Sequence, residues 1–338
     1  MLAGDFNRWD TRRAPAWHQL EPELWACDLE FPPDAYIEYA FFANMESGER
    51  LPDPLNVRAS SNGMDSANYT FYMPESRPTS LAMRQPNVPH GTVTYHVLES
   101  SWLLANGRRS VWLYQPLVSE PVPLVVVFDG SDYLNRGLLP DIVDNLVAQE
   151  RIRPVAMALI DHGGTARGIE YGCNEATVSF VTDLVLPLAR SELNLVDPAD
   201  APGAFGVLGA SAGGRMALFT ALSRPDIFGH VLSQSGAFHN GSHESVLFRL
   251  IRCCPMLPIK LWMDCGCYER LAGVNRQMVA MLAERGYDVT YREYSGGHNY
   301  PAWRNDVWRG LEALYGSARG DAGVDAFHRA SASIEHGK

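Results

Sequence analysis

One short run constrains the fold more than any other feature of the chain. Between residues 205 and 218, the sequence FGVLGASAGGRMAL joins an apolar strand-like segment, a G-x-S-x-G pattern and the apolar start of a helix. A serine on a sharp strand-to-helix turn has a strained backbone, and its neighbours two residues away must be small because strand and helix nearly touch. Gly209 and Gly213 meet this need. The run predicts Ser211 as a nucleophile, with a plain glycine-rich turn as the alternative.

The surrounding chain alternates apolar strand-like runs with helix-length segments. We expect strands at 92–99, 108–115, 123–129, 155–160, 204–209, 230–235, 259–264 and 288–295, and helices near 137–149, 174–192, 212–223, 243–252, 269–286 and 301–315. Asn106-Gly107 joins the first two strands and signals a hairpin. A hairpin followed by βα units predicts a mostly parallel sheet covered on both faces. The class is α/β, an α/β-hydrolase domain over residues 92–316.

The rest of the chain has a different composition. Residues 1–77 hold short aromatic or alternating runs separated by proline, glycine and asparagine, which predicts a small N-terminal β-sandwich domain. Residues 78–91 are proline-rich with little periodicity, as a linker would be. The segment 317–338 is rich in Gly, Ala, Ser and Asp, and we expect a poorly ordered tail.

A serine hydroxyl needs a base, and in this fold the order along the chain is serine, acid, histidine. Gly296-Gly297-His298 follows the last strand and supplies the candidate base, with a surface-loop histidine as the alternative. The acid should follow the preceding strand. Glu269 lies in the loop there and is preferred, while Asp264 at the strand end and Asp288 are the other candidates.

The tetrahedral intermediate needs two backbone N–H donors. One should come from Ala212, directly after the nucleophile. The other should come from the loop after the strand 123–129, where Gly130 or Ser131 can present its N–H, and we prefer Ser131. A simple turn at Asp129-Gly130 is the alternative.

Composition excludes several other classes of function. The net charge of −11 argues against a general nucleic-acid or anionic-membrane binder. The six cysteines form no C-x-x-C pair and no zinc pattern, so we expect reduced thiols and no metal site. We expect no membrane span. The first residues lack a basic and then apolar leader, and a cytoplasmic location is the expectation.

Several motifs stand out together in the second part of the chain. They are Phe128-Asp129-Gly130, Ile160-Asp161 with Arg167 to Asn174, Arg224 to Gly229 with Ser233 to Gly236, Gly266 to Glu269 with Asn275, and Gly296 to His298 with Trp303-Arg304. Together they resemble the motifs of the esterase D and enterochelin esterase family. The resemblance covers roughly 92–316. It implies Glu269 as the acid and no cofactor. The implied substrate is a small-molecule ester, the serine trilactone of a catecholate siderophore, either iron-free or in its ferric form.

The resemblance also implies substrate-binding residues. Arg167 would face the anionic ferric catecholate, and Asn174 and Trp303 would line the cleft. Arg167 has an equal alternative in a salt bridge to Glu170, three residues on. Arg215 departs from the apolar residue that the family usually has there, and either adds positive charge to the pocket or caps the surface of its helix.

The N-terminal part has its own likeness. Gly4 to Asp10 resembles the G-D-F-N-x-W start of sandwich domains in glycogen-branching enzymes and isoamylases, and Asp53 to Asn56 resembles a D-P-x-N segment of enterochelin esterases. We expect a structural domain that shapes the esterase cleft rather than a glucan-binding one. The alternative functions are a feruloyl or acetylxylan esterase, an acyltransferase and a non-catalytic glucan-binding protein.

Overall fold

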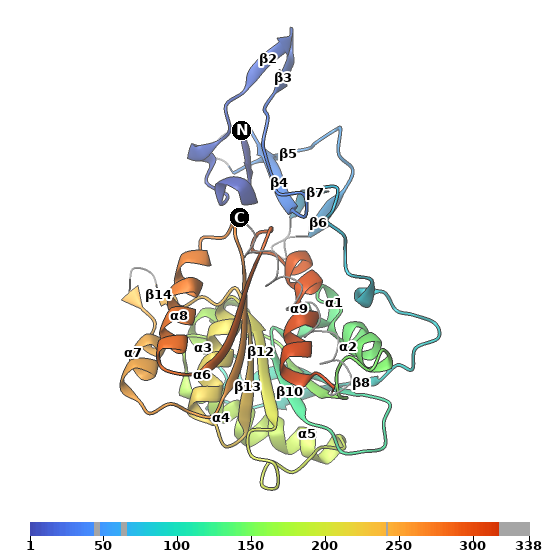
Figure 1. Ribbon diagram of the computed structural model, residues 1–338, viewed down its shortest axis with the longest axis vertical. Coiled ribbons are helices and arrows are strands. Elements are labelled where there is room, and N and C mark those ends of the chain that lie inside the picture. The colour runs from blue at the N-terminus through green and yellow to red at the C-terminus, as the bar shows by residue number, and fades with distance from the viewer. Residues whose placement is uncertain (44–47, 62–65, 241–242, 318–338) are drawn as a thin grey trace, which may run out of the picture.

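A computed structural model describes residues 1–43, 48–61, 66–240 and 243–317. A small β-rich module made by the start of the chain stands on a larger α/β body (Figure 1). The predicted tail, except Ser317, lies outside the described residues. The domain boundaries that the sequence suggests stay predictions.

The body is built on one eight-stranded sheet. Its strands are β8 (Thr92–Glu99), β9 (Arg108–Gln115), β10 (Leu124–Phe128), β11 (Ala156–Ile160), β12 (Phe205–Ala210), β13 (Phe228–Gln234), β16 (Lys260–Gly266) and β17 (Asp288–Tyr294). Their spatial order is β17-β16-β13-β12-β10-β11-β9-β8. β9 pairs antiparallel with both neighbours, and all other pairs are parallel. The predicted hydrolase-type sheet is confirmed, and its initial hairpin turns at Gly107 with φ of 69°.

Helices cover both faces of this sheet. Within β10, Leu124, Val126 and Phe128 pack on one face, while Val125 and Val127 pack on the other, as the two-residue period of a strand requires. The first face is covered by α4 (Glu175–Phe180), α5 (Leu186–Glu192), α6 (Ala212–Ser223), α7 (Val246–Cys253) and α8 (Ala272–Glu284). The second is covered by α1 (Gly130–Asn135), α2 (Leu139–Ala148) and α9 (Tyr300–Tyr315) (Figure 1).

The predicted helix at 174–192 is interrupted. Residues Val181–Val185 form a π-helical turn between α4 and α5. Pro187 lies in the first turn of α5 and has no N–H to continue the α-helical ladder, which accounts for the wider turn just before it. Short elements complete the body: α3 (Arg167–Glu170) and the two-stranded pair β14 (His239–Asn240) and β15 (His243–Glu244).

The N-terminal module consists of antiparallel sheets. One contains β1 (Leu2–Gly4), β4 (Tyr36–Phe42), β5 (Arg50–Leu51), β6 (Ala59–Ser61) and β7 (Ala67–Tyr72) in the order β1-β4-β7-β6, with β5 on β4. The other is the hairpin of β2 (His18–Glu21) and β3 (Leu24–Ala26), which projects away from the body (Figure 1). A 3-10 turn, Asp5–Asn7, follows β1 and brings the chain down to the edge where the parallel strands end.

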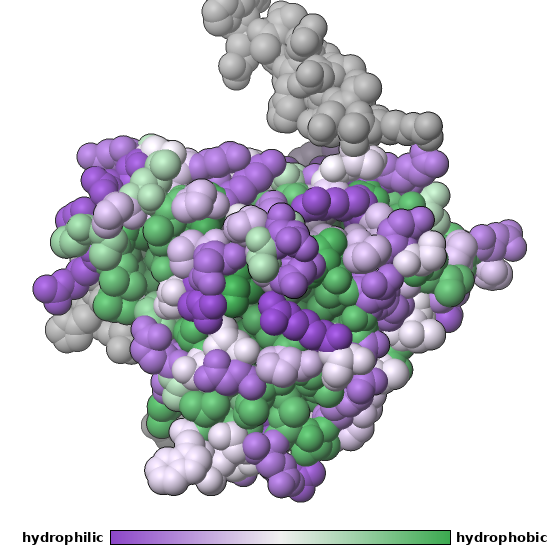
Figure 2. All heavy atoms as spheres, turned by 90° about the horizontal axis from the view of Figure 1, so that it is seen from below, coloured by the Kyte–Doolittle hydropathy of each residue, from purple (hydrophilic) through white to green (hydrophobic). Residues whose placement is uncertain are grey.

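Among the described residues, the module contacts the sheet at the end where its parallel strands finish. The N–H of Tyr36, which begins β4, donates to the carbonyl of Ser295 just after β17, at 2.9 Å. The opposite face of the molecule, seen from below, carries hydrophilic and hydrophobic residues interspersed (Figure 2). No helix among the described residues has the length and apolar character needed to cross a bilayer.

Candidate active site

Ser211 occupies the turn between β12 and α6. Its backbone has φ of 58° and ψ of −121°, a conformation that a residue with a side chain adopts only when its surroundings force it. The strand and helix approach each other as the glycine spacing predicts: a Cβ on Gly209 would lie 2.5 Å from the carbonyl carbon of Gly213. The serine therefore stands at the end of a buried strand and at the start of a 12-residue helix.

Two main-chain bonds hold this turn in place. The N–H of Ser211 donates to the carbonyl of Gln234 at 2.9 Å, and the carbonyl of Ser211 accepts from Ala237 N–H at 2.9 Å. Within the described ranges, Ser211 Oγ makes no hydrogen bond to His298. Catalytic hydrogen bonds are often long or poorly aligned before substrate binds and tighten when it does.

His298 lies in the loop between β17 and α9 and pairs with Glu269. Its Nδ1 lies 2.6 Å from Glu269 Oε2. The carboxylate is only 3% exposed, and its Oε1 accepts from the hydroxyl of Ser235 at 2.6 Å and from the N–H of Gly266 at 2.9 Å. An ionised carboxylate accepts only, so the proton of a neutral imidazole lies on Nδ1 and Nε2 carries the free lone pair.

The other two candidate acids, both in described ranges, do not contact His298. Asp264 is fully buried and accepts from the indole N–H of Trp262 at 3.0 Å and from Gln234 Nε2 at 3.2 Å. Burial, with the neighbouring Asp306, raises the pKa of Asp264 well above its ordinary value. Asp288 begins β17 beside Lys260, at the far end of the sheet.

Trp303 supports the histidine. Its ring lies edge-on to the imidazole of His298 with 4.9 Å between centroids, and its indole N–H donates to Ser235 Oγ at 2.9 Å. The side chain is 5% exposed, which leaves little surface for a ligand. Trp303 thus packs against the imidazole of His298, and its direct contact with substrate stays a prediction.

Free N–H groups lie at the two helix starts where the sequence predicts the oxyanion donors. Among the described residues, the N–H groups of Ala212, Gly130 and Ser131 have no hydrogen-bond acceptor, because each lies at the start of a helix. β10 and β12 are parallel neighbours, so the two helix starts lie at the same edge of the sheet. The side chain of Ser131 donates to Asp161 Oδ1 at 2.6 Å and fixes the loop. The choice between Gly130 and Ser131 stays open.

Arg167 fixes the same loop. Its Nε and Nη2 each lie 2.7 Å from an oxygen of Asp129, a bidentate pair. Asp129 is the residue before α1, and a Cβ on Gly213 would lie 3.0 Å from its Oδ2. The alternative salt bridge from Arg167 to Glu170 is wrong, because Glu170 instead accepts from Arg109 Nη2 at 2.7 Å. Arg167 keeps 30% of its side chain exposed, and contact with substrate stays a prediction.

Arg215 does not cap the surface of its helix, because it is only 8% exposed. Its guanidinium donates to two carbonyls, of Tyr171 at 3.0 Å and of His239 at 3.3 Å. No carboxylate of the described residues pairs with it. Burial, and the nearby charge of Arg167, lower the pKa of Arg215. An unpaired buried cation one helical turn after Ser211 gives this side of the site a positive field.

Asn174 has a local structural task. Its Oδ1 accepts from the N–H of Ala176 at 2.9 Å and caps the start of α4. The position of Asn174 in the cleft stays a prediction.

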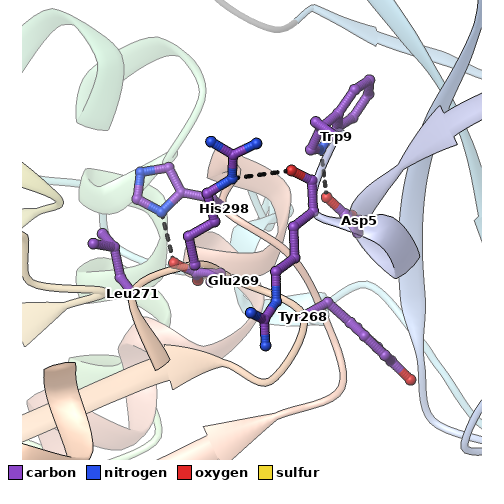
Figure 3. Close-up of a pocket in the computed structure, with 8 residues that line it drawn as sticks. Asp5, Trp9, Tyr268, Glu269, Leu271 and His298 are labelled. Carbon is purple, nitrogen blue, oxygen red and sulfur yellow. Dashed lines mark hydrogen bonds and ion pairs between the residues drawn. The ribbon is translucent and has the colours of Figure 1, made fainter. Parts of the chain in front are cut away.

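A cavity of about 420 Å³ opens beside His298 and Glu269. It is lined by Asp5, Arg8, Trp9, Tyr268, Glu269, Arg270, Leu271 and His298. Asp5 and Trp9 enter it from the N-terminal module, opposite His298 and Glu269 (Figure 3). The sequence singled out the G-D-F-N-x-W motif that contains Asp5 and Trp9, but only as a sign of fold. No local signal pointed from that motif to the active site.

One group of potential metal ligands occurs in the described ranges. Ligand atoms of His90, Asp141 and Asp144 lie within 4.8 Å of one another. Both imidazole nitrogens of His90 are already bonded, to Asp144 at 3.0 Å and to the carbonyl of Gln85 at 3.0 Å. Tyr114 also donates to Asp144 at 2.5 Å. The arrangement is that of a structural hydrogen-bond network.

The chain is similar to known esterases. The family described as Putative esterase matches residues 104–314, more than half of the chain. The iron(III) enterobactin esterase of Escherichia coli (strain K12) is 27% identical over 279 residues, covering 79% of this chain and 68% of that protein. The iron(III) salmochelin esterase of Escherichia coli O6:H1 is 28% identical over 315 residues, covering 85% and 73%.

Solved structures give the same fold. The ferric enterobactin esterase from Salmonella typhimurium superimposes with a TM-score of 0.74 at 24% identity, covering 88% of this chain and 83% of that one. A ferulic acid esterase from Anaeromyces mucronatus superimposes with a TM-score of 0.56 at 16% identity, covering 70% and 95%. The first of these structures covers the N-terminal module in part as well as the body.

Proposed function

This chain belongs to the esterase family that matches residues 104–314 and is a carboxylic ester hydrolase. We propose that it cleaves the ester bonds of a catecholate siderophore through an acyl-enzyme formed on Ser211. The observation that carries the mechanism is the 2.6 Å contact between His298 Nδ1 and the buried Glu269. It leaves Nε2 as the base. The similarity to iron(III) enterobactin and salmochelin esterases supports the substrate.

The reaction follows the logic of a catalytic triad. His298 Nε2 takes the proton of Ser211 as Oγ attacks the ester carbonyl, and Glu269 stabilises the imidazolium. The N–H groups of Ala212 and of Ser131 or Gly130 bind the oxyanion. His298 then gives the proton to the departing serine alkoxide of the trilactone. Water, deprotonated by the same imidazole, releases the acyl group from Ser211.

The charges around the site suit an anionic substrate. Arg215 has no carboxylate partner among the described residues, and Arg167 exposes part of its guanidinium beside the oxyanion loop. The chain as a whole carries −11, and Arg167 is paired with Asp129, so Arg215 is the cation that makes a local exception. Asn174 and Trp303 complete the proposed binding set. We place the reaction in the cytoplasm, in keeping with iron release after siderophore uptake.

The test compares ferric enterobactin, its iron-free form and a feruloyl ester as substrates for the native protein and for Ser211→Ala. We expect linear dihydroxybenzoylserine products from the native protein and none above background from the variant. Feruloyl release without siderophore cleavage would move the substrate to ferulic acid esters, the class named for the ferulic acid esterases of similar fold. Equal rates for native protein and variant would refute the mechanism itself.

A further inference from the structure

The N-terminal module contacts both loops that carry the catalytic pair. The Tyr36 N–H bond to Ser295 anchors the loop of His298. The loop of Glu269 is contacted by the ring of Phe31, whose centroid lies 5.9 Å from that of Tyr268 in an edge-on arrangement. Arg270 Nε donates to the carbonyl of Arg8 at 3.3 Å. The module therefore bridges the loop of His298 and the loop of Glu269, and the relative position of these loops sets the distance between the two side chains.

Asp5 lies against the loop of His298. Its carboxyl group lies directly over Gly297, the residue before His298 (Figure 3 shows Asp5 beside this loop). A Cβ on Gly297 would lie 2.0 Å from Asp5 Oδ1 and 2.1 Å from Cγ, far inside contact distance. Gly297 is not among the residues with positive φ. Glycine is needed at 297 because Asp5 occupies the space, and backbone freedom does not explain it.

The carboxyl group is held rigidly. Asp5 is 2% exposed, and its two oxygens accept from Glu38 N–H at 2.8 Å and from the Trp9 indole N–H at 3.0 Å. No cationic side chain in the described part of the chain pairs with it. Burial, and the facing carboxylates Glu38 on β4 and Glu269 after β16, raise the pKa of Asp5 to about 8. A fixed carboxyl group therefore fills the space over the histidine loop.

We propose that Asp5 is a positioning residue: it fills the space over Gly297 and so holds the loop of His298 against Glu269. The positioning role of Asp5 rests on the proposed function in one respect, namely that His298 is the base of the esterase mechanism. It makes the first residues of the chain part of the catalytic site without any contact with the reacting atoms. The G-D-F-N-x-W segment and the G-G-H segment then form one complementary pair across the molecule.

The test is a pair of substitutions that compete for the same space. Gly297→Ala should push the loop away from Glu269 and lower kcat on p-nitrophenyl acetate about 10- to 100-fold, with KM changed much less, as expected when a catalytic group moves by about an ångström. Asp5→Ala opens the space and should lower kcat less. The double variant Asp5→Ala/Gly297→Ala should recover at least several-fold over Gly297→Ala alone.

The control is Gly273→Ala on α8, where an added Cβ meets no atom within 4 Å, and it should behave like the native protein. A double variant no more active than Gly297→Ala, or a fully active Gly297→Ala, would overturn the proposal. A small aryl ester keeps this outcome separate from the siderophore question.

A second measurement does not depend on turnover. The Nδ1–H proton of His298, bound to Glu269, should give a far-downfield proton NMR signal in the native protein. The signal should weaken in Gly297→Ala and return in the double variant. Its persistence in folded Gly297→Ala would contradict the positioning role even if the chain hydrolysed no ester tested.

Discussion

Replacing Glu269 by glutamine would test the catalytic pair with almost no change of shape. The side chain cannot simply rotate to suit the histidine, because Oε1 must go on accepting from the Gly266 N–H at 2.9 Å and the Ser235 hydroxyl at 2.6 Å. An amide NH₂ at that position would face the N–H of Gly266. The NH₂ group of the glutamine must therefore occupy the place of Oε2, beside His298 Nδ1.

That orientation reverses the tautomer of the imidazole. With a donor beside it, Nδ1 must accept, and the proton moves to Nε2, which then cannot take the proton of Ser211. The same amide substitution in the triad of another serine hydrolase lowers kcat about 10⁴-fold. We expect a loss of about 10³- to 10⁴-fold here, which corresponds to roughly 4 to 5.5 kcal/mol of transition-state stabilisation.

The assay is the initial rate on p-nitrophenyl acetate between pH 6 and 9, for the native protein, Glu269→Gln and the control Glu284→Gln on the exposed side of α8. The control should match the native protein. Thermal unfolding should show Glu269→Gln folded, because the glutamine oxygen keeps its bonds from Gly266 and Ser235 and the NH₂ group donates to His298 Nδ1. A Glu269→Gln variant with more than about a tenth of the native kcat/KM would refute the tautomer reasoning.

Three further predictions follow from the charges around the site. Arg167→Met leaves the buried Asp129 without its bidentate partner and should lower the free energy of unfolding by roughly 2 kcal/mol. This loss is smaller than for a fully buried pair because Arg167 reaches solvent. The variant should also have a lower kcat, and urea titration with parallel kinetics checks both effects. Arg215→Met removes a buried cation with no carboxylate partner among the described residues, so urea titration should show an unchanged or higher free energy of unfolding. The same variant should lose more kcat/KM on an anionic ester than on a neutral one. Equal losses on the two esters would contradict a positive field from Arg215 at this side of the site. The pKa of Asp5 rises from 3.8 to about 8 on folding, so the free energy of unfolding should fall as the pH rises from about 4 to about 8, by at most about 6 kcal/mol. Asp5→Asn cannot ionise at this position and should lack this loss. Identical pH dependence of the two proteins in urea titrations would contradict the prediction.

The sequence predicted those features that depend on local pattern. Buried parallel strands are continuous apolar runs, so β10, β11, β12, β13 and β16 lie within a few residues of their predicted bounds. The helix α1 was missed because six residues give no usable periodicity. Arg167 shows the limit of local reasoning: a partner three residues away was available, yet the protein uses Asp129, 38 residues before it.

Asp5 and Gly297 show the same limit more strongly. The two segments are nearly 300 residues apart, and each has a sufficient local explanation, as a domain start and as a flexible loop. Only the folded chain shows that the carboxyl group of one fills the space left by the missing side chain of the other. A single sequence carries no periodicity or spacing that connects such positions.

Gln234 and Ser235 fix the position of Glu269, the proposed acid, relative to Ser211, the proposed nucleophile. The carbonyl of Gln234 accepts from Ser211 N–H, and Ser235 donates its hydroxyl to Glu269 while its N–H donates to Asp264 at 2.7 Å. Both residues are fully buried. The amide of Gln234 accepts from Tyr133 at 3.0 Å and donates to Asp264, so its donor and acceptor groups are both used.

A buried polar network with every member bonded is rigid, because any shift would leave a group unpaired at low dielectric. The turn of Ser211 and the acid are therefore fixed to the same dipeptide at the end of β13. His298 is joined to this network through Glu269 and the Trp303 ring, and its loop is the part that the N-terminal module must hold. Adjustment on substrate binding should then occur between His298 and Ser211, where no hydrogen bond joins the described residues.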